Sequence, residues 1–154
     1  MGNSKHIFIQ IDTDSFIQQY NQNGGNPLTP SQVLAHALVY DRGLVGYGSA
    51  IEQYTIYGSC EQQIHFTILP VKLYSSNKLS FTNFNNGQPI NGITLDDHVF
   101  PNPSNNMKRI SFKITIDKNF SGADFSLNVQ LEYGSGNIIP FTIDPVIQVR
   151  QPGG

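Results

Sequence analysis

Two carboxylates, Asp12 and Asp14, stand where an alternating stretch gives way to polar residues. Ile7, Ile9 and Ile11 fall on one face of that stretch, and the two carboxylates fall on the other. Side chains two apart on a strand lie roughly 6–7 Å apart on the same side, so the pair is predicted to emerge side by side. Because Ca²⁺ takes about six to eight oxygen ligands, two neighbouring carboxylates could begin a calcium site but not complete it.

This pair has two interpretations, a cation site and a turn. A calcium site needs further oxygens, and Asp144 is a candidate third carboxylate. In the simpler interpretation, Asp14 and Ser15 bind nearby backbone amides and turn the chain as it leaves the strand. The turn, with no cofactor, is the favoured prediction, and calcium bound by Asp12 and Asp14 is the alternative.

A second group of chemically active side chains is Asp96, Asp97 and His98, in the stretch LDDHVFPNP. A catalytic interpretation makes His98 a general base oriented by a carboxylate. Adjacent residues on a strand point to opposite sides, however, so Asp97 is poorly placed to orient His98. There is also no nucleophile motif, and Cys60 has no recognisable partner. We therefore predict a binding loop or a solvated loop and no catalytic residue.

Tyrosines gather in a glycine-rich stretch, residues 40–59, which includes Tyr47. An aromatic ring can cover the apolar face of a sugar while carboxylates and amides bind its hydroxyl groups. In the alternative, these tyrosines line the core and keep their hydroxyl groups at its rim. The candidate residues for glycan binding are Asp12, Asp14, Tyr47, Asp96, Asp97, His98 and Asp144.

The four histidines are scattered, and none has the i, i+2 or i, i+4 spacing of a zinc pair. Each is expected to be structural or exposed. His36, which follows a predicted short helix, is the one expected to be buried and hydrogen-bonded. The other three are His6, His65 and His98.

Composition narrows the class of partner. Charged residues make up 13% of the 154-residue chain, the net charge is −2, and the isoelectric point is near 6.0. A nucleic-acid-binding surface needs a basic stripe, which this balance argues against. Little long-range repulsion keeps copies apart, so a homo-oligomer is expected, and the partner is predicted to be a second copy of the chain.

The cysteine count, the N-terminal stretch and the length of the apolar runs indicate where in the cell the protein is expected. The single cysteine excludes an intrachain disulfide and a thiolate zinc cluster. The N-terminal stretch lacks the apolar core of a signal peptide, and no run is long enough to span a membrane. We expect a cytoplasmic protein with no membrane partner, and leave open both accumulation in inclusions and release without a signal peptide.

Alternation with a period of two predicts strands along most of the chain. Pro140 and Pro145 interrupt the last of them, which predicts an edge position or a bulge. Half-polar strands joined by short turns predict an all-β fold, an antiparallel β-sandwich of jelly-roll-like form. It is expected to be one domain over residues 1–154, ordered over about 5–150. The clearest alternating stretches are 63–69, 109–117, 125–133 and 139–149, and the predicted turns are 86–87, 91–92 and 134–137.

One helix is predicted, in the N-terminal third. The stretch TPSQVLAHAL offers Thr29 as N-cap, Pro30 at the first helical position and Gln32 to close a capping box. The helix is expected to last a turn or two before the chain becomes extended again near HALVYD.

Three stretches together resemble one family. IDTDSFIQQY opens the chain, NPLTPSQVLAHALVY (26–40) follows, and IDPVIQV (143–149) closes it. In order and spacing these are similar to the PixA/AidA-like inclusion-body proteins of bacteria. The middle differs, because members usually carry a tryptophan-containing strand where this tryptophan-free chain has TILPVKLYSSNKLSF (67–81).

The resemblance implies a non-enzymatic β-sandwich protein of a host-associated bacterium. Such proteins are made in quantity under growth-phase or quorum control, and some accumulate as intracellular inclusions. Asp12, His36 and Asp144 match motif positions to which the resemblance assigns no chemistry. A self-associating protein of this type is the leading prediction, and a lectin-like carbohydrate-binding β-sandwich, with or without calcium, is the alternative.

Overall fold

A computed structural model describes residues 4–41, 55–96 and 109–149, which form strands with two short α-helices. In the described parts of the chain, neither helix has the length and apolar character to cross a membrane. The elements in chain order are β1 (Ser4–Ile11), α1 (Thr13–Gln22), α2 (Pro30–Leu34), β2 (Ala37–Asp41), β3 (Thr55–Gly58), β4 (Gln63–Pro70), β5 (Lys78–Phe84), η1 (Asn85–Gly87), β6 (Ile93–Leu95), β7 (Ser111–Ile116), β8 (Ala123–Asp124), β9 (Leu127–Tyr133), β10 (Asn137–Ile143) and β11 (Val146–Val149).

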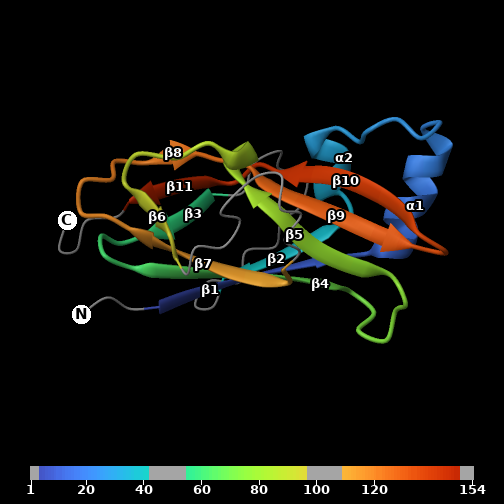
Figure 1. Cartoon of the computed structure of the whole chain (residues 1–154), viewed down its shortest axis with the longest axis horizontal. Coiled ribbons are helices and arrows are strands. Elements are labelled where there is room, and N and C mark those ends of the chain that lie inside the picture. The colour runs from blue at the N-terminus through green and yellow to red at the C-terminus, as the bar shows by residue number, and fades with distance from the viewer. Residues whose placement is uncertain (1–3, 42–54, 97–108, 150–154) are drawn as a thin grey trace.

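The strands form three sheets around one apolar core. The largest sheet has the order β2-β1-β4-β7-β6, and two three-stranded sheets have the orders β10-β9-β5 and β3-β11-β8. Figure 1 shows β1, β4 and β7 along the lower side of the molecule and β5, β9 and β10 above them. The prediction of an all-β, sandwich-like fold is confirmed.

Two strand pairs are parallel, whereas the sequence led us to expect antiparallel pairs throughout. β1 runs parallel to β4, from Ser4 opposite Gln63 to Ile11 opposite Pro70, and β3 runs parallel to β11. A parallel pair needs a long crossover connection. The chain between β1 and β4 provides one, because α1, α2, β2 and β3 all lie within it. The large sheet is therefore mixed.

Alternation places the apolar side chains between the layers. Phe112 of β7 stands at the centre of a cluster of rings, 5.2 Å from Phe66 of β4 and 4.9 Å from Phe81 of β5. Phe84 and Phe125 extend the cluster, with ring centroids 5.1 Å apart. Such ring contacts contribute about 0.5–1.5 kcal/mol each beyond their buried area, so they stabilise the packing of the large sheet against β5 and the segment before β9.

The chain changes layers just before β7. Arg109 exchanges two backbone hydrogen bonds with Phe81 of β5, and the next residue, Ile110, accepts one from the amide of Ile68 in β4. Ile110 shares the parity of the buried residues of β7 but is 57% exposed, because it lies at this crossing rather than within the strand.

The predicted helix is present as α2, and its cap is confirmed. Thr29 accepts from the amide of Gln32, the Gln32 side chain accepts from the amide of Thr29, and Pro30 occupies the first turn. The chain is extended again from Ala37. Pro140 lies in β10, the edge strand of its sheet, as its missing N–H requires.

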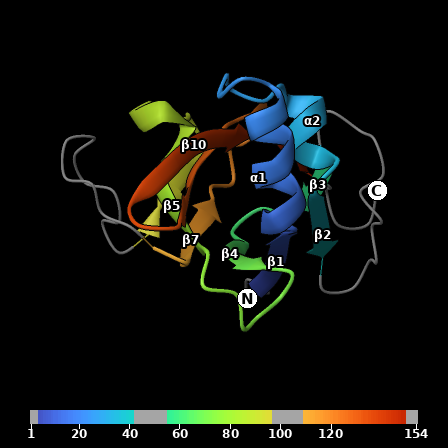
Figure 2. The ribbon, with the colours of Figure 1, turned by 90° about the vertical axis from the view of Figure 1, so that its right-hand side faces the viewer.

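A second helix, α1, follows β1 directly, where we had expected a turn. It ends in a Schellman motif, with the amide of Gly24 bonded to the carbonyl of Asn21 and that of Gly25 to Tyr20. Gly24 and Gly25 both have positive φ, +71° and +78°, which glycine adopts without strain. The prediction of one helix was thus wrong, and Figure 2 shows α1 and α2 together at one end of the molecule.

Candidate functional site

Asp12 is the N-cap of α1. β1 ends at Ile11, and the Asp12 side chain accepts a hydrogen bond from the amide of Ser15, 3.3 Å away. The first amides of a helix have no partner within the helix, so a carboxylate at this position both satisfies one and meets the positive end of the helix dipole. We had expected Asp14 and Ser15 to organise the turn, and the structure gives that role to Asp12.

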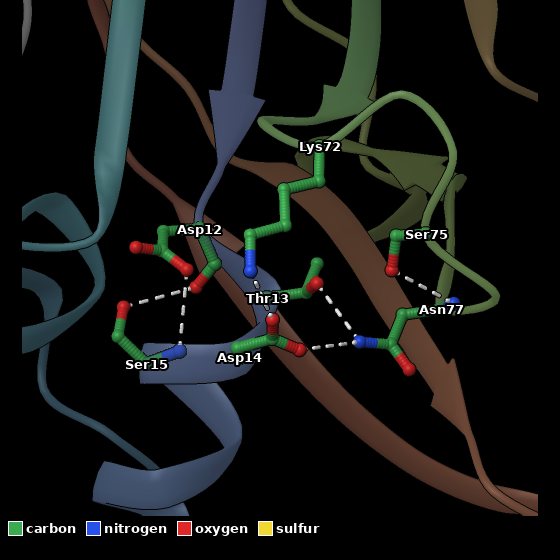
Figure 3. A network of polar contacts seen from close by, with 7 residues as sticks. All are labelled: Asp12, Thr13, Asp14, Ser15, Lys72, Ser75 and Asn77. Carbon is green, nitrogen blue, oxygen red and sulfur yellow. Dashed lines mark hydrogen bonds and ion pairs between the residues drawn. The ribbon is translucent and has the colours of Figure 1, made fainter.

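Asp14 joins a different set of contacts, drawn in Figure 3. Its carboxylate lies 3.2 Å from the ammonium of Lys72 and accepts a hydrogen bond from the Asn77 amide at 3.3 Å. The same Asn77 amide donates to the hydroxyl of Thr13, 2.9 Å away. Thr13 is buried, with only 4% of its surface exposed. These contacts tie the start of α1 to the loop between β4 and β5.

The Asp14 carboxylate changes the pKa of Lys72. Its hydrogen bond to the Asp14 carboxylate, together with the attraction of that charge, raises the pKa of the Lys72 ammonium above its ordinary value. Both side chains are more than half exposed, so water and salt screen the pair and its contribution to stability is small. The ion pair positions the loop more than it stabilises the fold.

The expectation that the two carboxylates stand side by side was wrong. They would do so on a strand, but the strand ends before Asp12 and the residues belong to a helix start, where positions i and i+2 do not face each other. In Figure 3 Asp12 points toward Ser15, and Asp14 points toward Lys72 and Asn77. Calcium at Asp14 would have to displace the ammonium of Lys72, and calcium binding here stays a prediction.

Replacing Asp12 separates a capping role from a cation role. Asp12→Ala is expected to cost about 1 kcal/mol in the free energy of unfolding, and to lower the melting temperature by about 2–4 °C. Asp12→Asn keeps a capping oxygen and is expected to stay within a few tenths of a kcal/mol of the native protein. Thermal unfolding followed by circular dichroism measures both, and equal losses in the two variants would argue against capping.

His36 fastens α1 to the chain ahead of β2. Its Nδ1 lies 2.8 Å from the hydroxyl of Ser15, and its Nε2 contacts the side-chain oxygen of Gln19. Its carbonyl accepts from the amide of Asp12 at 2.9 Å. Partial burial lowers the pKa of His36 against the opposing pull of the Asp12 carboxylate, so the ring is neutral near pH 7. The predicted hydrogen bonding is confirmed, although His36 is only partly buried.

Asp144 lies far from the first two carboxylates. It accepts a hydrogen bond from the Ser126 hydroxyl, 2.9 Å away, just before β9. Asn77, which contacts Asp14, directly precedes β5. The first residue of β5, Lys78, pairs with Glu132 near the other end of β9. The length of β9 separates the two places, about 20 Å for seven residues. The structure therefore does not bring Asp144 to the Asp12–Asp14 pair.

Of the remaining candidate ligands, the structure places one. Asp96 follows β6, and its carboxylate accepts a hydrogen bond from the Thr115 hydroxyl at 2.7 Å. Tyr47, Asp97 and His98 lie outside the described residues. Glycan binding through these residues stays a prediction.

The structure also brings together two histidines that the sequence left apart. His6 on β1 and His65 on β4 are direct neighbours in the parallel pair, with ring centroids 4.5 Å apart and planes within 5°. Their spacing in sequence is 59 residues, so no short motif marks them. Only the register of the β1–β4 pair could have revealed this contact.

An apolar groove of about 500 Å³ lies between the adjoining ends of β4 and β5. Its walls include Ile68, Leu69, Leu79 and Ile110. The loop between the two strands, residues 71–77, forms the end of the groove. It carries the most exposed large apolar side chains of the described residues, Leu73 at 71% and Tyr74 at 87%.

Comparisons with known proteins bear on the fold. No family model matches the chain, and no curated protein matches it. The structure is similar to the crystal structure of an inclusion body protein, PixA, from Burkholderia cenocepacia J2315, with a TM-score of 0.59 at 10% identity over 98% of this chain and 96% of that one. A likeness to the multicopper oxidase Fet3p has a TM-score of 0.33 and covers 28% of that chain, too weak to carry an argument. At 10% identity, the first likeness shows a shared fold.

Proposed function

We propose that this chain is a non-enzymatic, self-associating protein of the bacterial inclusion-body type. The fold similarity to PixA supports this proposal, since it extends over nearly the whole length of both chains. The three sequence blocks similar to that family support it as well. They contribute to β1 and α1, to α2 and β2, and to β11, so the similarity extends to several elements of the fold. Accumulation in inclusions and a role in host association belong to the same proposal.

The observation that carries self-association is the apolar groove with the loop beside it. Monomeric proteins rarely leave large apolar side chains clustered on the surface. Here Leu73, Tyr74, Val71 and Ile110 are each at least 40% exposed, and Leu73 and Ile110 also line the groove. Val71, Leu73 and Tyr74 lie within residues 67–81, the stretch that differs from the pattern of the PixA/AidA-like proteins.

A second copy of the chain fits this surface. A two-fold axis makes each patch face its own copy, so the exposed Tyr74 of one molecule can enter the groove of the other, and the reverse. The groove also has side chains of both signs on its wall, Lys78 and Glu132, which a two-fold axis can place opposite each other. With a net charge of only −2, repulsion between copies is weak.

Sedimentation velocity tests this surface. Leu73→Ser combined with Tyr74→Ser removes the exposed apolar side chains of the loop, and is expected to shift the association constant by about tenfold or more toward monomer. Leu38→Ser is the matched control, since Leu38 is 41% exposed but lies on β2, which β1 separates from β4. It is expected to leave the association unchanged. If the double variant associates as the native protein does, the proposed interface is wrong.

A further inference from the structure

A second groove, of about 350 Å³, lies on the outer face of the five-stranded sheet. Its volume is at the small end of the roughly 300–1,000 Å³ typical of small-molecule sites. Its lining consists of Phe112 and six side chains that can donate a hydrogen bond, four of them basic: His6, His65, Thr67, Arg109, Ser111 and Lys113.

The strand register explains why the donors converge. His6 is opposite His65, and His65 is opposite Lys113, so these three form one row across β1, β4 and β7. Two positions along, Thr67 is opposite Ser111 and adds two hydroxyl groups on the same face. Arg109 lies two residues before Ser111, at the other end of the groove.

The charges around the stacked rings favour an anion. Partial burial, the neighbouring His6 and the ammonium of Lys113 all lower the pKa of His65, and the carboxylate of Asp96 opposes them. Among the described residues, Lys113 and Asp96 are the charged groups that act on His65 beside His6, and Arg109 also lines the groove. Two imidazolium rings at 4.5 Å repel each other, and an anion between the row and Arg109 would relieve that repulsion.

A metal ion fits the pair poorly. Zinc binds imidazole nitrogens at about 2.0–2.1 Å, with the lone pairs directed at a common point. The lone pairs lie in the ring planes, and the two planes here are nearly parallel, so they do not converge on one ion. Within the described residues, no group of three or more His, Cys, Asp or Glu side chains is placed to hold a metal.

We propose that the groove formed by His6, His65, Arg109 and Lys113 binds a tetrahedral oxyanion, a phosphate or sulfate group, and binds it more tightly as His65 becomes protonated. Arg109 and Lys113 supply charge-assisted hydrogen bonds at every physiological pH. Thr67 and Ser111 donate to the same oxygens from the sheet face. The ligand is either the free ion or a small molecule that carries the group.

The pH dependence has a definite sign. The folded pKa of His65 lies below its ordinary value of 6.5, so the neutral ring contributes stability that is present above pH 6.5 and lost as the pH falls through the folded pKa. A bound oxyanion favours the charged ring and offsets that loss. Oxyanion binding is thus expected to strengthen, and to take up protons, from about pH 7.5 to about pH 5.5.

Isothermal titration of the full chain with sodium sulfate tests the proposal, because sulfate keeps its charge over this range and the pH dependence reports the protein alone. Sodium chloride holds the ionic strength constant. We expect saturable binding near pH 5.5 and binding at least about tenfold weaker near pH 7.5. Titrations with inorganic phosphate and with glycerol phosphate then distinguish the free ion from a phosphomonoester, whichever binds more tightly.

Variants connect the binding to the row of side chains. His65→Gln and Lys113→Gln are each expected to weaken sulfate binding about tenfold, the effect of losing one charge-assisted hydrogen bond. Lys118→Gln, beyond the far end of β7, removes the same charge elsewhere and is expected to have no effect. His6→Gln serves if His65→Gln unfolds, which thermal unfolding without sulfate reveals. Absence of saturable binding near pH 5.5, or equal binding by Lys113→Gln and Lys118→Gln, would overturn the proposal.

Discussion

Phe16→Ala is expected to lower the free energy of unfolding by about 3–5 kcal/mol, the usual cost of removing a buried ring from a well-packed core. Phe16 is fully buried and is the residue by which α1 enters the core. Its ring centroid lies 4.7 Å from that of Phe141 on β10 and 5.9 Å from that of His36. Truncation to alanine leaves a cavity between these partners and releases the helix that positions Asp12 and Asp14.

Urea unfolding measures this loss. It is followed by circular dichroism, because the chain has no tryptophan, and at one protein concentration, because association would add to apparent stability. Phe16→Leu is the matched control, since it keeps most of the apolar volume and is expected to cost about 1.5 kcal/mol or less. A loss below about 1 kcal/mol in Phe16→Ala would mean that α1 is not anchored as described.

Gly92→Ala is expected to cost about 2–5 kcal/mol, the sum of backbone strain and a steric clash. Gly92 has φ of +91°, and a Cβ placed there would lie 2.9 Å from the Cβ of Phe120 and 3.0 Å from its Cα. Backbone atoms cannot rotate away as the end of a side chain can. The turn cannot move freely either, because the Gly92 carbonyl accepts from the amide of Asp117 at 2.8 Å.

Gly136→Ala isolates the backbone strain from the steric clash. Gly136 in the β9–β10 hairpin has nearly the same φ, +93°, but nothing lies within 4 Å of an added Cβ. Its substitution is expected to cost only the strain, about 1–2 kcal/mol. Urea unfolding of both variants gives the difference, and equal losses would contradict the close contact between Gly92 and Phe120.

The parts of the fold that could be predicted from sequence are those with local causes. Alternation identified β4, β7 and β9 because each buries one face, and the capping box of Thr29 and Gln32 identified α2 because both of its hydrogen bonds span three residues. Helix α1 was missed because its apolar side chains are few. Phe16, Ile17 and Tyr20 at helical spacing, followed by Gly24 and Gly25, were the available signal.

The rest depends on contacts between residues that are distant in the chain. The parallel direction of the β1–β4 pair determines that His6 meets His65, and no local pattern encodes that direction. Asp12 and Asp14 were identified as noteworthy, but their roles depend on where β1 ends. Because β1 ends at Ile11 and does not reach Asp14, the two carboxylates form a helix cap and an ion pair with Lys72, which is 58 residues from Asp14.

Sedimentation velocity of the native chain over a concentration series, from about micromolar to hundreds of micromolar, tests self-association most directly. The proposed function predicts a weight-average mass that rises above the 17.1 kDa of one chain as concentration increases. It also predicts that raising the salt concentration weakens this association little, because apolar contacts in the groove provide most of the binding energy. A mass that stays at 17.1 kDa throughout the series would contradict it.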